Sequence, residues 1–383
     1  MTRVMTVVGT RPELIRLSRV IDRLDRTVDH VLVHTGQNWD PMLSEIFFTE
    51  LGLRPPDRLL ELDRSSLGRV LAGVLSGVEQ AILELRPDAL VVLGDTNSCL
   101  AALMARRMRI PVYHLEAGNR CFDLNVPEET NRRLVDHVSD FNLVYTEHAR
   151  SNLLAEGLHP RRILHIGSPM REVLEHYRPQ IEASGVLRRL ELRPGEYFVV
   201  SAHREENVDD PARLDRLLDC LRAVRREWGL PLLMSTHPRT RKRLEERRVE
   251  SGSLEGIAFH EPFGLLDYVH LQTRARCTLS DSGTISEESA ILGFPAVTLR
   301  ESIERPEALD AGSIVMTGLD PGGLVEAIAI VMGQASTEGV PCPADYRITD
   351  TSRRVVDFIL STVRRHGDWA GVRPRPLSPA VRS

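Results

Sequence analysis

The sequence of 383 residues contains a single lysine, Lys242, which lies in the strongly charged run RTRKRLEERR. A Schiff-base mechanism needs a lysine in the active site, and a Walker-type phosphate loop needs one beside the phosphates. Because Lys242 is expected on a solvated helix face, both chemistries are disfavoured. Anion binding is left to arginine, whose planar guanidinium suits bidentate contacts with phosphate.

Other patterns are missing as well. No apolar run approaches the roughly 18 residues that a membrane span needs, and the N-terminus, MTRVMTVVGT, lacks a signal-peptide pattern. The five cysteines form no CxxC pair, so we expect reduced thiols in a cytoplasmic protein. Neither a metal-ligand spacing nor GxGxxG occurs, so we expect no catalytic metal and no nicotinamide cofactor. With a net charge of −5, neither nucleic acid nor a membrane is an expected partner.

What is present is a regular alternation of apolar, strand-like runs and amphipathic segments. The 42% hydrophobic content is typical of a globular protein, and the length is sufficient for two domains with full cores. Such alternation predicts an α/β fold in which helices cover both faces of a parallel sheet. The pattern restarts part-way, so we expect two doubly wound, Rossmann-like domains. The expected strands are 4–8, 30–34, 89–93, 112–114, 141–145 and 163–166, then 197–202, 232–236, 257–259, 276–279 and 296–299.

We predict a first domain over residues 1–176, a charged and irregular linker over 177–195, and a second domain over 196–349. A helix over 350–366 is expected to return to the first domain, and the Pro- and Arg-rich end, 367–383, is expected to be disordered. Ligands of open α/β sheets bind at the carboxyl ends of the strands. Two facing domains would therefore place their strand ends around one cleft.

The stretch TLSDSGTISEES offers the most specific local signal. A short strand there feeds a helix through Ser282, Gly283 and Thr284, and free N–H groups at the positive end of a helix dipole favour phosphate. Glu288 lies one turn further along the same helix face, where a carboxylate suits ribose hydroxyls. Thr284 and Glu287 also match a capping box, which we predict in addition.

Acidic residues follow three expected elements of the first domain. Asp95 comes just after one buried strand in LGDTNS, and Glu116 comes after the next in HLEAGNR. Glu128 and Glu129 begin a helix in PEETNRR. Carboxylates gathered in a cleft can divide acid and base duties. A lone acid at such a position more often caps a helix or is solvated, but three at equivalent positions favour a function.

Basic residues lie at other strand ends. In VVGTRPE, Arg11 lies beside a helix N-terminus and suits a diphosphate, and the alternative is simple capping by Thr10 and Glu13. In SAHREEN and STHPRTR, His203 and His237 follow strands of the second domain. A histidine there can bind phosphate or transfer protons, and the alternative for each is a hydrogen-bonded structural histidine.

Taken in order, GTRPE, GDT, HLEAG, PEETNRR, SDSGTISEE and ERPEA resemble the non-hydrolysing UDP-N-acetylglucosamine 2-epimerases. The resemblance covers nearly the whole chain. It implies the GT-B fold, with a UDP-sugar in the cleft between two Rossmann-like domains. It also implies epimerisation at C2 through anti elimination of UDP to 2-acetamidoglucal and syn re-addition, without a cofactor, in a homodimer.

The resemblance further implies roles for individual residues. Asp95, Glu116 and Glu128 would be the acid and base carboxylates, and His203 would lie near the diphosphate. Which carboxylate removes the proton stays open. The residues implied in substrate binding are Arg11, Arg16, His237, Phe263, Tyr268, Ser282, Gly283, Thr284, Glu288 and Arg305.

The sequence departs from the family pattern at several places. Arg16 replaces a common lysine after GTRPE, and Thr284 replaces the last glycine of a Ser-Gly-Gly turn. The run QNW at 37–39 replaces a Gln-His-Arg motif that binds an activating second UDP-sugar, which puts allosteric activation in doubt. The family has a Gln-x-x-x-x-Phe site near the base of the nucleotide. In this sequence, Phe263 and Tyr268 are expected to face that base.

The identity of the sugar is less well defined than the reaction. TGQNWD, HLEAGNRCFD and SDSGTISEES look closer to the branch that acts on 6-deoxy UDP-N-acetylhexosamines and gives UDP-N-acetyl-L-fucosamine. Two other hypotheses stay open: a GT-B glycosyltransferase, which shares the helix-tip nucleotide site, and a catalytically silent UDP-sugar sensor. A hydrolysing epimerase that releases free sugar is a variant of the first hypothesis.

Overall fold

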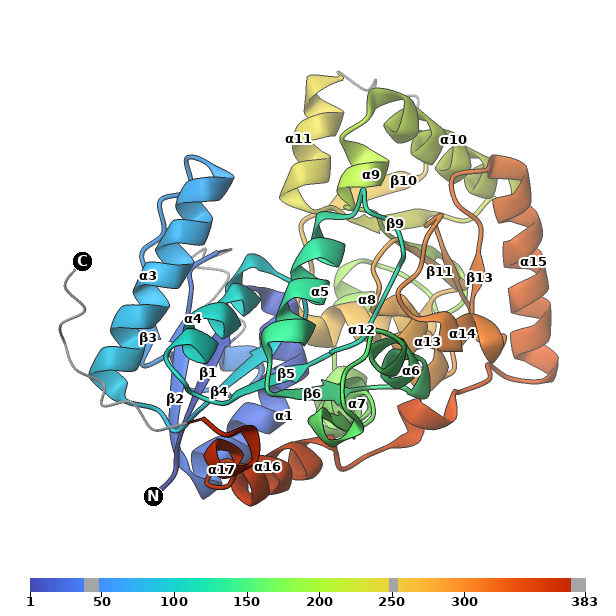
Figure 1. The fold of residues 1–383 in the computed structure, drawn as a ribbon. Coiled ribbons are helices and arrows are strands. Elements are labelled where there is room, and N and C mark those ends of the chain that lie inside the picture. Colours follow the sequence, from blue (N-terminus) through green and yellow to red (C-terminus); the bar gives the residue numbers. More distant parts are fainter. Residues whose placement is uncertain (38–47, 248–253, 373–383) are drawn as a thin grey trace. The chain divides into compact units, whose positions relative to one another are not determined.

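The computed structural model describes residues 1–37, 48–247 and 254–372, which fall into two compact units (Figure 1). Unit 1 comprises Met1–Val173 together with the chain from Ile348 onward, and unit 2 comprises Leu174–Arg347. Each unit has its own parallel sheet with helices on both faces, which confirms the predicted α/β class.

In the described part of unit 1, the sheet has seven parallel strands in the order β3-β2-β1-β4-β5-β6-β7. The chain crosses from one side of β1 to the other between β3 and β4, so helices cover both faces. The strands are β1 (Arg3–Val8), β2 (Asp29–His34), β3 (Arg58–Leu59), β4 (Ala89–Leu93), β5 (Val112–Leu115), β6 (Phe141–Val144) and β7 (Ile163–His165). The helices are α1 (Arg11–Thr27), α3 (Leu67–Leu85), η1 (Asn97–Leu100), α4 (Ala101–Arg107), α5 (Pro127–Val138), α6 (Glu147–Ala155), η2 (Pro160–Arg162), α16 (Thr351–Thr362) and α17 (His366–Ala370). Helix α7 (Pro169–Glu182) begins in unit 1 and continues into unit 2.

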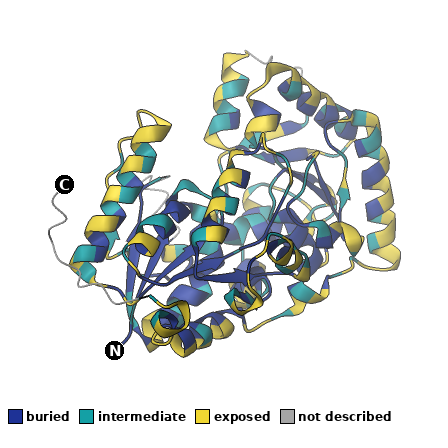
Figure 2. Ribbon diagram, viewed as in Figure 1, coloured by how far each residue is buried: buried dark blue, intermediate teal, exposed yellow. Residues whose placement is uncertain are grey.

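Alternate side chains of the unit 1 strands divide between two faces. Met5 and Val7 of β1 point to a core that α3, α4 and α5 cover. The residues between them point to the opposite face, where α1 packs on β1 and β2, and α16 packs on α1. In α1 the buried Leu14, Leu17 and Ile21 recur at helical spacing. The strands are accordingly buried, while the outward sides of the helices are exposed (Figure 2).

In unit 2 the described strands form a six-stranded parallel sheet in the order β10-β9-β8-β11-β12-β13, the strand order of a Rossmann fold. Phe198 and Val200 of β8 face a core shared with α10 and α15, whereas Val199 faces α8 and α12. The strands are β8 (Phe198–Ser201), β9 (Leu232–Ser235), β10 (Ile257–His260), β11 (Cys277–Ser280), β12 (Ala296–Thr298) and β13 (Val315–Met316). The helices are α8 (Val186–Arg189), α9 (Glu205–Val208), α10 (Pro211–Trp228), α11 (Pro238–Glu246), α12 (Leu265–Arg274), α13 (Ile285–Leu292), α14 (Pro306–Asp310), α15 (Pro321–Thr337) and η4 (Ala344–Arg347).

The stretch 177–195 differs from the irregular linker that its charge predicts. Helix α7 continues through Pro179, and α8 follows shortly after. Val186 of α8 is fully buried in a cluster with Tyr197, and Leu190 packs against the same cluster. The prediction fails because the apolar residues between the charges are spaced to pack on the core of unit 2.

The end of the chain adds two helices to unit 1. Helix α16 packs on α1, and the Thr351 hydroxyl at its start donates to the Ile166 carbonyl at 3.2 Å. Helix α17 occupies the beginning of the tail that we predict to be disordered, and residues 373–383 lie outside the described residues. None of the described helices has the length and apolar character that a membrane crossing requires.

Candidate active site

Asp95 and Glu116 leave neighbouring strands at the same edge of the unit 1 sheet. Strands β4 and β5 run parallel, and Leu93 at the end of β4 pairs with Leu115 at the end of β5. Asp95 lies two residues after Leu93, and Glu116 directly follows Leu115. Both carboxylates therefore belong to the carboxyl ends of the strands, where open α/β sheets bind ligands.

A tight turn at Glu116 brings its side chain to Arg16. The φ angle of Glu116 is +63°, a left-handed conformation that costs a residue with a side chain about 1 kcal/mol or more. Gly118 follows with φ of +80°, and a Cβ there would lie 2.3 Å from the Ala149 carbonyl oxygen. The Glu116 side chain is 12% exposed, and its Oε2 lies 3.1 Å from Nη1 of the buried Arg16. Arg16 thus holds a candidate catalytic carboxylate.

Arg132 of α5 joins Asp95 to a second carboxylate. Its Nη2 pairs with the Asp95 carboxylate, and its Nη1 lies 2.8 Å from Glu129 Oε2. The Arg132 side chain is almost fully buried, so little water competes for its donors. The sequence prediction does not include Arg132, because only the folded chain brings Asp95 close to α5.

Of the two glutamates that begin α5, only Glu129 is held by the fold. It is fully buried and accepts hydrogen bonds from the Cys121 N–H at 3.2 Å, from Arg132 at 2.8 Å and from Arg133 Nε at 3.0 Å. Burial alone would raise the pKa of Glu129, but these donors outweigh burial and lower the pKa. Glu128 is half-buried, and no described residue forms a hydrogen bond or ion pair with its carboxylate. Glu128 is therefore available to a ligand.

A buried network fixes the turn that carries Glu116. Asp136 of α5 accepts hydrogen bonds from the Gly118 N–H at 3.1 and 3.2 Å, and its Oδ1 lies 2.9 Å from His114 Nδ1. The other ring nitrogen of His114 lies 2.8 Å from the Gly94 carbonyl oxygen. Asp136 and His114 are fully buried, so these contacts replace water completely. Neither residue is among the predicted site residues, although His114 stands in the HLEAGNR motif.

Arg11 is the first residue of α1 and is half-buried. The preceding Thr10 makes no side-chain cap; its hydroxyl instead donates to Glu13 at 2.7 Å. Glu13 also accepts the Gly9 N–H at 3.0 Å. The predicted capping by Thr10 and Glu13 therefore takes place only through the Glu13 carboxylate.

In unit 2, His203 follows β8, which pairs with β11 just before the Ser282 turn. The fully buried Asp281 accepts the N–H groups of His203, at 2.9 and 3.1 Å, and of Arg204, at 3.0 Å. It also accepts Asn207 Nδ2 at 3.1 Å, and its Oδ1 lies 3.3 Å from His203 Nδ1. Asp281 thus fixes the histidine loop to the turn. It stands in the quoted SDSGT motif directly after a strand, the same signal that identifies Asp95, yet it is not predicted.

His237 serves as a helix cap. Its Nδ1 accepts the Arg239 N–H at 3.2 Å at the start of α11, which is the structural role considered for it from the sequence. The ring is nevertheless exposed, and its centre lies 5.6 Å from that of His203. The two histidines therefore share one edge of the unit 2 sheet.

Ser282, Gly283 and Thr284 form the tight turn between β11 and α13. The Ser282 N–H donates to Ser280 Oγ at 3.0 Å, and the hydroxyls of Ser282 and Thr284 lie 3.0 Å apart. Within the described part of the chain, the Gly283 N–H has no acceptor. A Cβ at Gly283 would lie 2.5 Å from Arg305 Nη1, so glycine allows the guanidinium to lie against the turn.

The predicted capping box of Thr284 and Glu287 is wrong. Thr284 has helical backbone angles, φ −72° and ψ −20°, and makes no side-chain cap. The buried Glu287 carboxylate lies 3.0 Å from Nε of the equally buried Arg305. A buried guanidinium binds a carboxylate more strongly than one amide does, so the distant arginine takes the place of the local cap.

Glu288 is held by a neighbour that the sequence does not reveal. It is buried on α13, and Gln272 Nε2 of α12 donates to its Oε2 at 2.8 Å. Gln272 is itself 1% exposed, and its own Oε1 is buried with no partner in the described residues. Only one orientation of the amide keeps the bond to Glu288, so Gln272 fixes that carboxylate.

Phe263 and Tyr268 are half-buried and pack against the unit 2 cluster that contains Tyr197 and Leu271. The ring centre of Phe263 lies 5.7 Å from that of His260. Packing therefore accounts for part of both side chains.

Of the run at 37–39, only Gln37 is described. Its Oε1 accepts a hydrogen bond from the Ser98 hydroxyl at 3.1 Å, which links it to the start of η1. Residues 38 and 39 lie outside the described residues, so the altered motif has no structural account.

A family profile described as UDP-N-acetylglucosamine 2-epimerase matches residues 22–360. The chain belongs to this family. It is therefore an isomerase, a non-hydrolysing 2-epimerase, as the ordered motifs indicate.

Known relatives support this assignment along nearly the whole chain. The UDP-N-acetylglucosamine 2-epimerase of Methanocaldococcus jannaschii is 36% identical over 335 residues, 86% of this chain and 92% of the relative. The UDP-2,3-diacetamido-2,3-dideoxy-D-glucuronate 2-epimerase of Pseudomonas aeruginosa is 33% identical, covering 87% and 93%. The crystal structure of the M. jannaschii epimerase in complex with UDP-GlcNAc and UDP has a TM-score of 0.87, with 94% of this chain and all of that chain covered at 33% identity. The likeness confirms the predicted GT-B fold.

Proposed function

We propose that this epimerase interconverts UDP-N-acetylglucosamine and UDP-N-acetylmannosamine by elimination and re-addition of UDP. The hydrogen at C2 has no adjacent carbonyl and is scarcely acidic. Cleavage of the C1–O bond makes C1 electron-poor, and a base can then remove the C2 proton to give 2-acetamidoglucal and UDP. Re-addition of UDP at C1, with protonation of C2 from the opposite face, gives the epimer.

The proton transfers fall to Asp95, Glu116 and Glu128. The observation that carries the proposal is that Asp95 and Glu116 leave adjacent strand ends, each beside an arginine, while Glu128 is unengaged. Each guanidinium fixes the position of its carboxylate. An unengaged carboxylate can accept a proton without breaking an ion pair, so we assign removal of the C2 proton to Glu128. Because the epimer forms by protonation of C2 from the opposite face, we assign that step to Asp95 or Glu116.

The remaining groups suit the departing UDP. The negative charge that develops on the leaving diphosphate calls for donors that are already in place. In unit 2 the candidates for this role are the Gly283 N–H, Arg305 and His203, and in unit 1 the candidate is Arg11. Glu288, whose Oε2 is held by Gln272, is the candidate for the ribose hydroxyls. Arg16 and the histidine cap at 237 would support these contacts, and the rings of residues 263 and 268 would contact the base.

Incubation of the chain with UDP-N-acetylglucosamine in D2O tests the proposal. We expect proton NMR to show UDP-N-acetylmannosamine, and deuterium at C2 of both sugars. The same sample should contain no free N-acetylmannosamine, which a hydrolysing enzyme would release. A folded sample that exchanges no deuterium at C2 would refute the assignment.

A 6-deoxy UDP-N-acetylhexosamine is a second candidate substrate. The motifs at 35–40, 114–123 and 280–289 look closer to epimerases of 6-deoxy UDP-N-acetylhexosamines, and a 33% identical relative is named for a different UDP-sugar. UDP-N-acetyl-6-deoxyhexosamines should therefore be compared with UDP-N-acetylglucosamine at equal concentration. A higher kcat/KM for the 6-deoxy sugar would move the assignment to that substrate.

We also propose a homodimer in the cytoplasm. Helix α3 supports the dimer, because Leu67 at its start is 65% exposed and Leu75 two turns later is half-buried. The five cysteines are all free thiols, as expected for a reducing compartment. Sedimentation equilibrium tests the first proposal: a monomer mass across the working concentration range would contradict it. Fractionation of cells that express the chain tests the cytoplasmic location, which recovery of the chain outside the cytoplasmic fraction would contradict.

A further inference from the structure

The carboxylate of Glu13 joins two loops that leave different strands of the unit 1 sheet. Its Oε2 accepts hydrogen bonds from the Gly9 N–H at 3.0 Å and from the Thr10 hydroxyl at 2.7 Å, in the turn after β1. Its Oε1 accepts the Thr96 hydroxyl at 3.1 Å, in the turn after β4. Glu13 is only 2% exposed, so these bonds replace water around the carboxylate.

The two loops are also closely packed. A Cβ at Gly9 would lie 1.8 Å from Ser98 Oγ and 2.2 Å from Thr35 Oγ1, so the first loop rests directly on these hydroxyl groups. The Thr96 hydroxyl accepts the Ser98 N–H at 3.2 Å at the start of η1. Because a close-packed interior transmits displacements, a shift of one loop would move the other.

We infer that Glu13 is a positioning residue for the epimerase reaction, which holds the turn of Arg11 and the turn of Asp95 in a fixed relation. We call the hydrogen bonds that Glu13 accepts from the two turns the Glu13 clamp, with one arm at Gly9 and Thr10 and the other at Thr96. Arg11 directly follows Thr10, and Asp95 directly precedes Thr96, so each arm ends beside a residue with a proposed role. The inference rests on the function proposed for Arg11 and Asp95. Glu13 is buried and acts only through these neighbours.

The charge of Glu13 supports the inference and makes it testable. Burial raises the pKa of Glu13 to about 7, although the hydrogen bonds from Thr10, Gly9 and Thr96 oppose the shift. An ionised carboxylate accepts all three bonds, whereas a protonated carboxyl must use one oxygen as a donor. The clamp is therefore complete only in the ionised form, whose fraction rises as the pH passes upward through about 7.

The groups that face Glu13 carry their charge differently. Burial raises the pKa of the Cys99 thiol on η1 well above its usual value, and the nearby carboxylates of Asp95 and Glu13 add to the shift, so the thiol stays neutral at neutral pH. Asp95 is paired with the Arg132 guanidinium. On the β2 side, burial lowers the pKa of His34 to about 4. Of these groups, Glu13 is the one whose pKa lies near 7.

The test is the pH dependence of kcat/KM for C2 proton exchange in the full-length chain. Glu13→Gln keeps the shape of the side chain but does not titrate. Glu172→Gln is the matched control, because Glu172 is another hydrogen-bonded glutamate of unit 1, which accepts the Ser352 N–H at 2.7 Å and contacts neither loop. We expect the wild type and the control to gain activity as the pH rises through about 7.

For Glu13→Gln we expect this ascending limb to be absent and kcat/KM to be about tenfold lower at high pH, with most of the loss in kcat. An ascending limb that belonged to another group would survive in the variant. An unchanged limb and an unchanged kcat/KM in Glu13→Gln would overturn the inference.

If Glu13→Gln fails to fold, two variants of Thr96 test whether Glu13 positions the two turns. Thr96→Val removes one arm of the clamp, and Thr96→Ser keeps the hydroxyl that donates to Glu13. We expect Thr96→Ser to retain most activity and Thr96→Val to lose about tenfold. Equal activity in the two variants would overturn the inference. A wild type without C2 exchange at any pH would instead refute the proposed function.

Discussion

Replacement of Gly283 by alanine would test whether Arg305 and the Ser282 turn act together. The added Cβ would lie 2.5 Å from Arg305 Nη1, whereas ordinary contacts begin at 3.4 Å, so the guanidinium has to move by roughly 1 Å. Arg305 cannot move freely, because it is buried and its Nε lies 3.0 Å from Glu287. A displacement of about 1 Å near the reacting groups can cost on the order of 100-fold in rate.

We therefore expect Gly283→Ala to lower kcat/KM for C2 exchange by about 10- to 100-fold. Overpacking should also lower the free energy of unfolding by about 1–3 kcal/mol, measured by urea denaturation. Gly333→Ala is the matched control, since a Cβ at this glycine of α15 would meet nothing within 4 Å. We expect that control to keep full activity with equal or greater stability. A kcat/KM of Gly283→Ala within about twofold of the wild type would refute the argument, because it would mean that the position of Arg305 is unimportant.

Three further predictions follow from other contacts. Glu128→Gln should lower kcat by about 100-fold or more and leave the Kd for UDP-N-acetylglucosamine, measured by calorimetry, nearly unchanged; equal losses in both would indicate a positioning role. Gln272→Leu removes the donor to Glu288, so the Kd for UDP should rise by about tenfold, and an unchanged Kd would contradict a role for this pair. The Arg120 hydrogen bond lowers the pKa of Glu156 from its ordinary value of 4.5 to about 2. Ionised Glu156 therefore stabilises the fold above pH 4.5, and this stability is lost as the pH falls toward 2. Glu156→Gln should lose less stability than the wild type between pH 7 and pH 3 in urea denaturation, and equal losses would contradict the pairing.

The sequence predicts those features that depend on neighbouring residues. Runs such as ALVVL over β4 are apolar on both faces, so they identify buried parallel strands and the positions that follow them. Asp95 and Glu116 could be proposed for that reason alone. The two-residue strands β3 and β13 are too short to give a pattern, and their pairing depends on the rest of the sheet.

Contacts between distant segments explain why the predicted capping box is wrong and why Arg132 is not predicted. Thr284 and Glu287 have the spacing of a capping box, but Arg305 comes from beyond β12 and takes the carboxylate. Arg132 likewise gains its importance only when α5 lies beside the end of β4. The spacing of neighbouring residues does not predict such partners, because the energy of a buried ion pair depends on burial and geometry that the whole fold creates.

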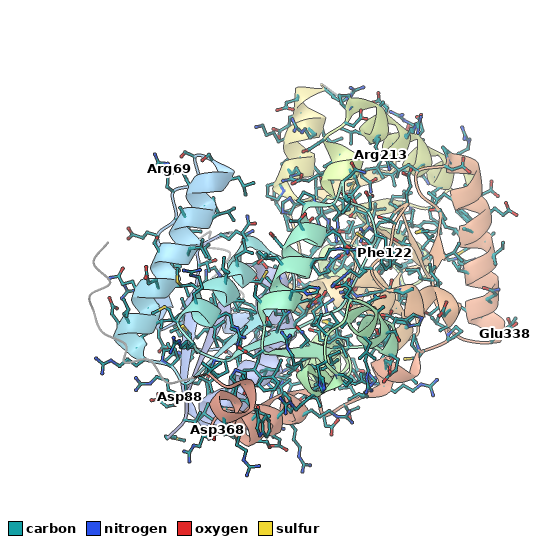
Figure 3. The ribbon with its side chains drawn as sticks, in the orientation of Figure 1. Arg69, Asp88, Phe122, Arg213, Glu338 and Asp368 are labelled. Atoms are coloured by element: carbon teal, nitrogen blue, oxygen red, sulfur yellow. The ribbon has the colours of Figure 1, made fainter. Side chains whose placement is uncertain are left out.

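The contacts of Asp136 have a consequence for engineering. The acid on α5 receives the Gly118 N–H and lies against His114, so the 116–120 loop and α5 would have to be transplanted together in any chimaera with a relative. A graft that changed the path of the loop alone would take the Gly118 N–H and the Arg120 guanidinium away from the buried Asp136, at a cost of several kcal/mol. Phe122, which Figure 3 labels, and Leu124 lie between these two elements and are 70% and 80% exposed, so neither side chain is packed inside the network of Asp136. Libraries aimed at new sugars should therefore vary Leu124 first and leave the 116–120 loop, Cys121 and α5 unchanged.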